Sequence, residues 1–472
     1  MVALLFGHQT LGFTGIVLPL VIMTPLLMIS KPKWVLMFYW CWVIVSPTFE
    51  FVIRNRFVNL AEQAFAAYLL AFLLGDLVLR RTRTPGTTHF TRIVQLLLGW
   101  TLLSGFVNDV PVMVQLHYAS GYLKHIVLFY FSVRFLDPGD ARNMFRVMFW
   151  SFAVQVIFNF AYVVGINPLP RMIGRNPYDS FVGTLYSCHD VGYFSIVAVL
   201  MFLSLRRHVN SYFKRLVCIG AAIVALVHFA FTYTIHGYFL IAIGMATQFM
   251  FFWGGRRTLY TRWLGLALLI LCTSMVVLIE SGSIRWAKEI AAETGLDVRV
   301  ISAFRGLKGQ AYRDVFTRGD EILPYPFFGG GPGNYASNSA IVFNRPLARS
   351  TLAYAYSGAD YLTRLETGSV LGAPRAGLIS MWGDLGPIGS VLFWSLHVYA
   401  AVRIWRQYRM GMYGDTYRQT MAEVLVPMIC IFLALSTIID AISTPHLHNG
   451  LWIWIGFMWN HEKPESDRAA RR

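Results

Sequence analysis

Long apolar runs, separated by polar connections, follow one another along almost the whole chain. A helix needs about 17–25 mostly apolar residues to cross a bilayer. The runs lack the alternation over about ten residues that a membrane β-strand shows, and in lipid a helix satisfies its own backbone hydrogen bonds. The pattern predicts helical spans at 11–30, 34–50, 59–79, 93–108, 113–134, 143–165, 187–205, 216–235, 237–254, 263–280, 376–402, 420–440 and 447–460.

These runs predict an all-α polytopic membrane protein with about 12–13 transmembrane helices. Residues 1–280 would hold transmembrane helices 1–10, and residues 376–460 the C-terminal ones. Between them lies one large loop, 281–375, and residues 461–472 form a tail. The first ten residues lack a basic leader and a small-residue cleavage site, so we expect the first span to be retained.

The composition agrees with a membrane protein and the charge orients it. The chain is 56% apolar and 14% charged, whereas soluble proteins carry about 25% charged residues. The net charge of +16 lies mainly in short connections beside apolar runs. This is typical of cytoplasmic loops and not of a nucleic-acid-binding face, so we expect no nucleic acid partner.

Connections 134–146, 206–215, 255–262 and 403–418 are therefore predicted to be cytoplasmic, together with the C-terminus. The large loop then lies on the opposite face. Thirteen spans would put Met1 on that face too, so either a boundary is wrong or one segment is not a full span. The side of the N-terminus stays open.

The large loop is predicted to be partly helical. Ser283 and Asp297 are suitable N-caps for helices at 284–294 and from 298 onward, and residues 327–335 form a glycine-rich turn after Pro324 and Pro326. The loop is rich in arginine and contains neither His nor Cys. Arginine binds phosphate through its planar fork of donors, so a lipid diphosphate is a reasonable ligand. The alternative is that most of these arginines are solvated or paired with acidic residues of the loop.

Several polar residues fall inside or beside predicted spans, where they are costly and often functional. They are Lys124, His125, His236 and Asp384. The alternatives are that they form hydrogen bonds between helices or face a water-filled cavity. His446 and His448 lack a third ligand, so we expect no metal site. The glycine run lacks the Lys-Ser/Thr of a nucleotide-binding loop, and a structural turn is favoured over a backbone anion site.

Four stretches, in this order, resemble motifs of the O-antigen ligase/polysaccharide polymerase superfamily of bacterial envelope glycosyltransferases. Phe181 to Ser187 resembles its "G-T/F-x-x-N" stretch, and Thr232 to Tyr238 its "T-x-S-R-G" stretch. Arg313 to Asn334, ending Pro326-Phe327-Phe328-Gly329-Gly330-Gly331-Pro332-Gly333-Asn334, resembles "R-x-x-W…P-x-x-G-x-G-P-G-N". Arg375 to Gly389 resembles "H-N-x-x-L…E-L-G-x-x-G". The third stretch is the most specific, and the similarity covers about residues 100–460.

The resemblance implies a metal-independent enzyme of GT-C-like architecture in the bacterial inner membrane, with no cofactor and with the large loop in the periplasm. Such an enzyme moves an oligosaccharide from undecaprenyl diphosphate to an acceptor hydroxyl, among membrane lipids and other polysaccharide-assembly proteins. The family's Arg in "S-R-G" is His236 here, and its His in "H-N" is Arg375. We therefore hypothesise that the two roles are exchanged, so that Arg313 and Arg375 hold the diphosphate and His236 lies near the acceptor.

Five further residues are candidate ligands of the diphosphate or the glycan. They are Arg171, Arg175, Arg305, Lys124 and Asp384. Loss of the "H-N" pair favours a polymerase of exopolysaccharide or O-antigen repeats over an O-antigen ligase acting on lipid A core or another acceptor. A flippase or other transporter of lipid-linked glycan is the alternative of another class. It would be expected to show paired broken helices rather than a long basic loop.

Overall fold

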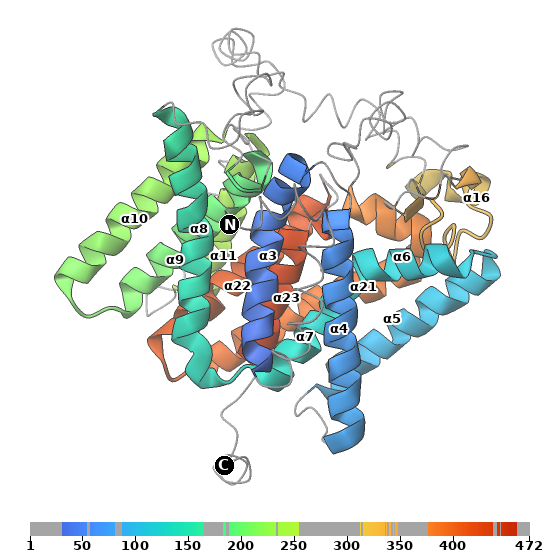
Figure 1. Cartoon of the computed structure of the whole chain (residues 1–472), viewed down its shortest axis with the longest axis horizontal. Coiled ribbons are helices and arrows are strands. Elements are labelled where there is room, and N and C mark those ends of the chain that lie inside the picture. Colours follow the sequence, from blue (N-terminus) through green and yellow to red (C-terminus); the bar gives the residue numbers. More distant parts are fainter. Residues whose placement is uncertain are drawn as a thin grey trace, which may run out of the picture.

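The structure, a computed structural model, describes most of the predicted helices and part of the large loop. The described residues are 31–53, 57–80, 87–164, 183–185, 188–232, 235–253, 312, 315–335, 337, 339–340, 343, 345–347, 376–437, 441–443 and 445–459. Within this part the regular structure is helical, with one isolated bridge between Tyr325 and Gly329. The helices (Figure 1) are α3 (Pro32–Ile53), α4 (Phe57–Arg80), α5 (Thr88–Val107), α6 (Val112–Tyr122), α7 (Lys124–Phe135), η1 (Pro138–Asp140), α8 (Ala141–Val163), α9 (Cys188–His208), α10 (Tyr212–Phe231), α11 (Ile235–Phe251), α16 (Gly319–Ile322), α21 (Gly377–Arg409), α22 (Thr416–Ser436), η3 (Ala441–Ser443) and α23 (Pro445–Trp459).

Among the described residues, six helical segments are long and apolar enough to cross a membrane. They are Thr88–Val107, Pro138–Ala161, Asp190–His208, Tyr212–Phe231, Gly377–Arg409 and Thr416–Ser436. The prediction of an all-α polytopic membrane protein is therefore confirmed at this level. The predicted spans 11–30 and 263–280, and the predicted loop helices at 284–294 and from 298 onward, lie outside the described residues.

Two predicted spans differ in the structure. The run 113–134 is not one helix but two, because the backbone turns at Leu123 between α6 and α7. The run 376–402 extends to Arg409 as α21, and its backbone leaves the helical conformation at Gly386. Apolar periodicity predicts which residues are helical. A change in helix direction cannot be predicted from the sequence when the residues on both sides of it keep the apolar pattern.

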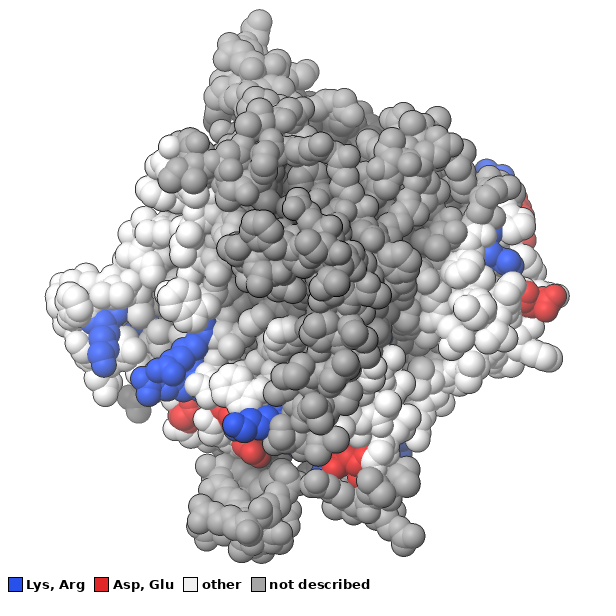
Figure 2. All heavy atoms as spheres, viewed as in Figure 1, with Lys and Arg blue, Asp and Glu red and all other residues white. Residues whose placement is uncertain are grey.

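Three connections, each flanked by basic residues on the adjoining helix ends, lie on the same side of the bundle, the lower side in Figure 1. They are 136–140, 209–211 and 410–415, and they lie within the predicted cytoplasmic connections 134–146, 206–215 and 403–418. Ion pairs join helices here: Arg134 Nε lies 2.6 Å from Asp76 Oδ2, and Lys33 Nζ lies 3.0 Å from Asp140 Oδ1. Figure 2 shows lysine and arginine side chains along this edge, with acidic side chains beside them. The helices thus carry their basic ends together.

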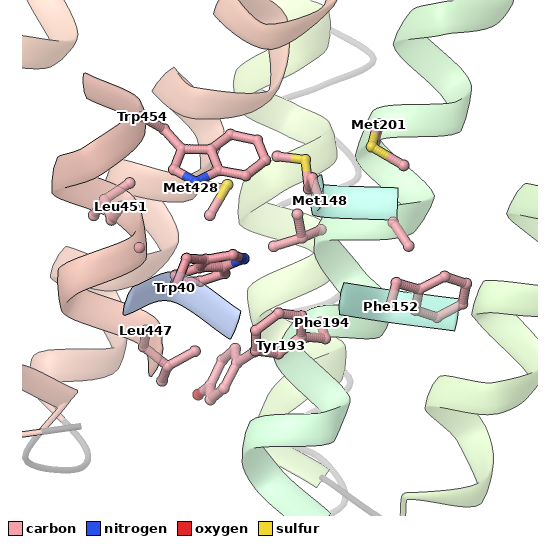
Figure 3. Close-up of a pocket in the computed structure, with 13 residues that line it drawn as sticks. Trp40, Met148, Phe152, Tyr193, Phe194, Met201, Met428, Leu447, Leu451 and Trp454 are labelled. Atoms are coloured by element: carbon pink, nitrogen blue, oxygen red, sulfur yellow. The ribbon is translucent and has the colours of Figure 1, made fainter. Parts of the chain in front are cut away.

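A narrow apolar cavity of about 50 Å3 lies inside the bundle between α3, α8, α9, α22 and α23 (Figure 3). Trp40, Met428 and Trp454 are among the side chains that line it. The Trp40 indole N–H donates to Ser151 Oγ at 2.9 Å, so this polar group is satisfied within the wall. The cavity surface is therefore almost entirely hydrocarbon and thioether.

Gly450 of α23 lies directly against the Trp40 ring, and its replacement by alanine should destabilise the bundle. An added Cβ would lie 2.0 Å from Trp40 Cζ3, and overpacking of this kind typically costs about 1–3 kcal/mol. We expect Gly450→Ala to lower the thermal unfolding midpoint of the protein in detergent. Gly220→Ala on α10 is the control, because nothing lies within 4 Å of its added Cβ. Equal midpoints for the two variants would contradict this packing.

Candidate active site

The candidate site is built on a break in α21. Gly386 has φ 68° and ψ −176°, a conformation that essentially only glycine adopts, and Pro387 after it has no N–H to donate. At the break, backbone carbonyl groups of α21 lose the N–H groups that would donate to them in a continuous helix. In a membrane protein such carbonyl groups need other hydrogen-bond donors. The Trp100 indole N–H donates to Leu385 O at 2.8 Å, and the Gly330 N–H donates to Gly383 O at 2.7 Å. One donor comes from α5 and the other from the glycine-rich turn.

The glycine-rich turn of the large loop fits into this break. Added Cβ atoms would lie 2.4 Å from Gly386 N at Gly329, and 2.3 Å from Phe327 O at Gly386. Gly331 and Gly333, with φ 92° and 80°, pack in the same way against Val110 and Val114. The spacing of glycines is thus explained by close contact with the backbone of α21 and with side chains at the α5–α6 corner, as expected for a structural turn.

Asp384 connects the two elements. Its side chain is fully buried, and Oδ1 accepts hydrogen bonds from the backbone N–H groups of Asn334 and Tyr335 at 3.1 and 2.7 Å. A carboxylate that accepts backbone N–H bonds makes strong, charge-assisted hydrogen bonds. The backbone N–H groups of the turn are therefore directed at the protein's own carboxyl group.

The side chain of Asn334 in turn positions an arginine of the loop. The Asn334 amide donates to Gly330 O at 2.8 Å and accepts from Arg345 Nε at 2.8 Å through Oδ1. The Arg345 N–H donates to Ala340 O at 2.8 Å. Arg345 is half-buried, and because its Nε is held, the side chain has a defined direction while the terminal nitrogens stay available as donors.

A histidine of α6 lies beside the same segment. His117 Nδ1 is 2.8 Å from Ser339 Oγ, and its ring contacts Phe343 edge to face, with 5.4 Å between centroids. Ser339 also accepts the Phe343 N–H at its carbonyl. The described residues of the segment 334–345 thus supply an arginine, an amide and a hydroxyl, and α6 adds an imidazole beside the hydroxyl. These groups are of the kinds that bind a phosphate or a sugar.

Aromatic packing holds the described part of the loop against the bundle. Phe328 stacks on Trp100 with 5.0 Å between ring centroids, and Phe316 packs on Trp382 at 4.4 Å. The Tyr312 hydroxyl donates to Thr437 O at 2.5 Å, at the end of α22. Burial raises the pKa of Tyr312 above its ordinary value, so the hydroxyl keeps its proton and remains a donor at neutral pH.

Residues 183–185, from the first stretch that carries the resemblance, are fixed to α8. The N–H of Thr184 donates to Gln155 Oε1 at 2.8 Å, and that of Gly183 donates to Asn159 Oδ1 at 3.0 Å. Asn159 Nδ2 also lies 2.9 Å from His228 Nε2 on α10. The first stretch is therefore linked to the helix that leads into the second stretch, which begins at Thr232.

A second polar cluster lies inside the bundle, where three helices bring together His125, His397 and His448. All three side chains are at most 1% exposed. The Trp452 indole N–H lies 3.0 Å from His448 Nε2, and His397 Nε2 lies 3.3 Å from the same atom. Among the described residues no group of His, Cys, Asp or Glu is arranged to hold a metal ion. The cluster joins α7, α21 and α23 through side-chain contacts.

The structure places two of the predicted site residues with their side chains. Asp384 is at the break, and Lys124 begins α7, next to His125. The backbone of His236 lies in the first turn of α11, but its side chain is not among those that the structure describes. Five predicted residues lie outside the described residues altogether: Arg313, Arg375, Arg171, Arg175 and Arg305. Their predicted roles, and that of Asp384 as a substrate ligand, stay predictions.

Sequence reasoning did not single out Arg345, His117 or His397. Arg345 was one of many loop arginines, and nothing in the chain ranks it above the others until its bond to Asn334 is seen. His117 and His397 lie within apolar runs. An imidazole within an apolar run is energetically costly, and this cost could have identified both residues as candidates.

Comparison of the sequence with models of known protein families gives no match, and comparison with curated proteins gives none either.

Proposed function

We propose that this protein is a polysaccharide polymerase of the bacterial inner membrane. It would transfer an oligosaccharide from undecaprenyl diphosphate to a sugar hydroxyl at the periplasmic face. The observation that carries the proposal is the contact between the glycine-rich turn and the break in α21 through Asp384. These two elements come from the third and fourth of the stretches that carry the resemblance to the glycosyltransferases, 313–334 and 375–389, of which the third is the most specific.

The chemistry of the site suits a diphosphate leaving group. In the transfer, the bond between the anomeric carbon and the diphosphate oxygen breaks and the diphosphate keeps the electron pair. Preorganised cationic donors stabilise that developing charge, and Arg345 is such a donor because Asn334 fixes its Nε. Arg313 and Arg375 would complete the group of cations. The acceptor hydroxyl forms the new bond and loses its proton, for which His236 is the proposed base.

A ligase would use the same donor with another acceptor, and remains the alternative within this class. A transporter fits less well. Transporters use broken helices to hold their substrates at the break, but here the break in α21 is filled by the protein's own turn. The freed carbonyls of Gly383 and Leu385 are occupied by protein donors.

Deletion of the gene followed by gel analysis of surface glycans distinguishes the three activities. We expect single repeats to remain attached to their acceptor, or lipid-linked single repeats to accumulate, because polymerisation is lost. Long polymer accumulating on undecaprenyl diphosphate would instead indicate a lost ligase. Repeats that stay on the cytoplasmic face would indicate a lost flippase.

A further inference from the structure

The imidazole of His117 is held at one nitrogen by the large loop. Its Nδ1 lies 2.8 Å from Ser339 Oγ. The loop is packed closely against α6 here, because a Cβ added to Gly333 would lie 2.9 Å from Val114 Cγ1 and 3.0 Å from Ser339 Cβ. The ring is half-buried, and no residue in the described part of the chain forms a hydrogen bond with its Nε2. His117 is thus oriented through one nitrogen and keeps the other for a ligand.

Burial of the Ser339 hydroxyl favours one tautomer of this imidazole. The Ser339 side chain is 1% exposed, and the partner of its hydroxyl is His117 Nδ1. Buried hydroxyl groups form hydrogen bonds with protein or ordered water, and Nδ1 can accept this one only when the ring proton is on Nε2. Neutral His117 therefore presents an N–H donor at Nε2.

An aromatic ring lies beside this donor. Phe343 contacts the His117 ring edge to face, with 5.4 Å between centroids, and 39% of Phe343 is still exposed. The face of an aromatic ring is electron-rich and attracts the C–H groups on the apolar side of a pyranose. A few placed polar groups beside such a surface fix the orientation of a ligand. The pair is therefore suited to a sugar.

One turn of the loop joins this pair to Arg345. The Phe343 N–H donates to Ser339 O at 3.0 Å, and the Arg345 N–H donates to Ala340 O at 2.8 Å. These two bonds close the chain from residue 339 to residue 345. A sugar on His117 and Phe343 would consequently lie within one turn of the chain from the arginine that we propose for the diphosphate.

The surroundings of His117 on α6 are apolar and exposed. Met113, one turn before it, is 67% exposed, and the adjacent Leu116 is 58% exposed. In Figure 1, α6 lies beside the described residues of the large loop. His117 thus lies where exposed apolar helix surface meets the polar loop. A sugar carried by a membrane lipid would meet the protein at such a boundary.

We propose that His117 and Phe343 form a subsite for a pyranose of the acceptor glycan. The Nε2–H group donates to an oxygen of the sugar, and the apolar side of the pyranose packs on Phe343. His117 binds the acceptor, and His236 stays the proposed base. The inference rests on the proposed function, because it takes the acceptor of that reaction as the ligand.

The test measures how one repeat, as a free oligosaccharide, binds to the full-length protein in nanodiscs. The repeat is prepared by partial hydrolysis of the host's own surface polysaccharide, so it carries neither lipid nor diphosphate. Its dissociation constant is obtained by titration, and saturation-transfer NMR shows whether its C–H groups contact the protein. Transfer from undecaprenyl diphosphate is measured separately with the same protein.

Two substitutions of His117 separate sugar binding from contact with the loop. In His117→Asn the shorter amide can still accept from Ser339 but does not reach the place of Nε2. In His117→Gln the amide nitrogen reaches about that place. We expect binding about tenfold weaker for His117→Asn, since one hydrogen bond to the ligand is lost, and affinity near the native value for His117→Gln.

Phe343→Leu tests the aromatic half of the subsite. It keeps an apolar side chain but removes the ring face, so we expect binding about fivefold weaker. Tyr325→Leu is the matched control. Tyr325 is another exposed aromatic residue of the loop, 49% exposed, and lies outside the turn 339–345. This variant should bind the repeat as the native protein does.

A weaker affinity for His117→Gln than for His117→Asn would overturn the proposal, because it would mean that the imidazole acts only through the loop. Equal losses in Phe343→Leu and Tyr325→Leu would do the same, as would no binding of the repeat to the native protein at millimolar concentration. The expected binding pattern without any transfer would refute the polymerase and leave a glycan subsite. Transfer with native affinity in both His117→Asn and Phe343→Leu would refute the subsite alone.

Discussion

Gly386→Ala is expected to separate the glycine-rich turn from α21 and to abolish glycan polymerisation. The backbone at this position, φ 68° and ψ −176°, is strained for any residue with a Cβ, at a cost of about 1–3 kcal/mol. The added Cβ would also lie 2.3 Å from Phe327 O. Relief of that contact requires the turn to move, and movement breaks the bonds from Asn334 and Tyr335 to Asp384. The measurement is polymer length on glycan gels, with protein abundance in the membrane measured in parallel.

Gly411→Ala is the matched control for this variant. Gly411 has nearly the same φ, 70°, but nothing lies within 4 Å of its added Cβ. It therefore reports the effect of a Cβ at a positive φ without the contact to the turn, and we expect polymer of normal length. If Gly386→Ala made normal polymer, or if both variants lost it equally, the turn in the break would not be the basis of the activity.

Arg345→Gln is expected to lower the transfer rate by about 10- to 100-fold while leaving the fold intact. A hydrogen bond to a charged group contributes about 1.5–3 kcal/mol, and the guanidinium would contact the diphosphate as its charge develops. The loss should therefore fall on kcat more than on KM. Arg345→Lys keeps the charge but loses the fork that Asn334 positions, so we expect only partial rescue.

Arg318→Gln is the control for Arg345→Gln. Arg318 is another loop arginine, but it pairs with Glu321, 2.9 Å from Nε to Oε2, and both side chains are largely exposed. An exposed pair of this kind contributes little, so transfer should stay near the native rate. Equal effects at the two positions would show that the loop needs its total positive charge rather than an oriented Arg345.

The class of fold could be predicted from the sequence because apolar length is a direct signal of a membrane helix. The turn at 327–335 was also predictable, since glycine and proline determine backbone conformation locally. The division at Leu123 was not, because both halves of the run 113–134 remain apolar. The break at Gly386 is marked in the sequence by the pair Gly-Pro. That pair alone does not predict that a segment 50 residues earlier in the chain packs into the break.

The candidate site was predictable only in part, for a related reason. Asp384 is costly in an apolar run, and this singled it out. Its contact with Asn334 and Tyr335 depends on how the loop folds back, which no local pattern encodes. In the sequence, nothing distinguishes Arg345 from the other arginines of the loop. Only its hydrogen bond to Asn334, seen in the structure, distinguishes it.

The most direct measurement of the proposed function is transfer by the purified protein in liposomes supplied with an undecaprenyl-diphosphate-linked oligosaccharide. We predict a ladder of longer lipid-linked glycans and release of undecaprenyl diphosphate without added metal or nucleotide. Alanine at His236, Arg313 or Arg375 should abolish both. A donor that stays unchanged, or that only crosses the bilayer, would contradict the account, as would full transfer by all three alanine variants in folded protein.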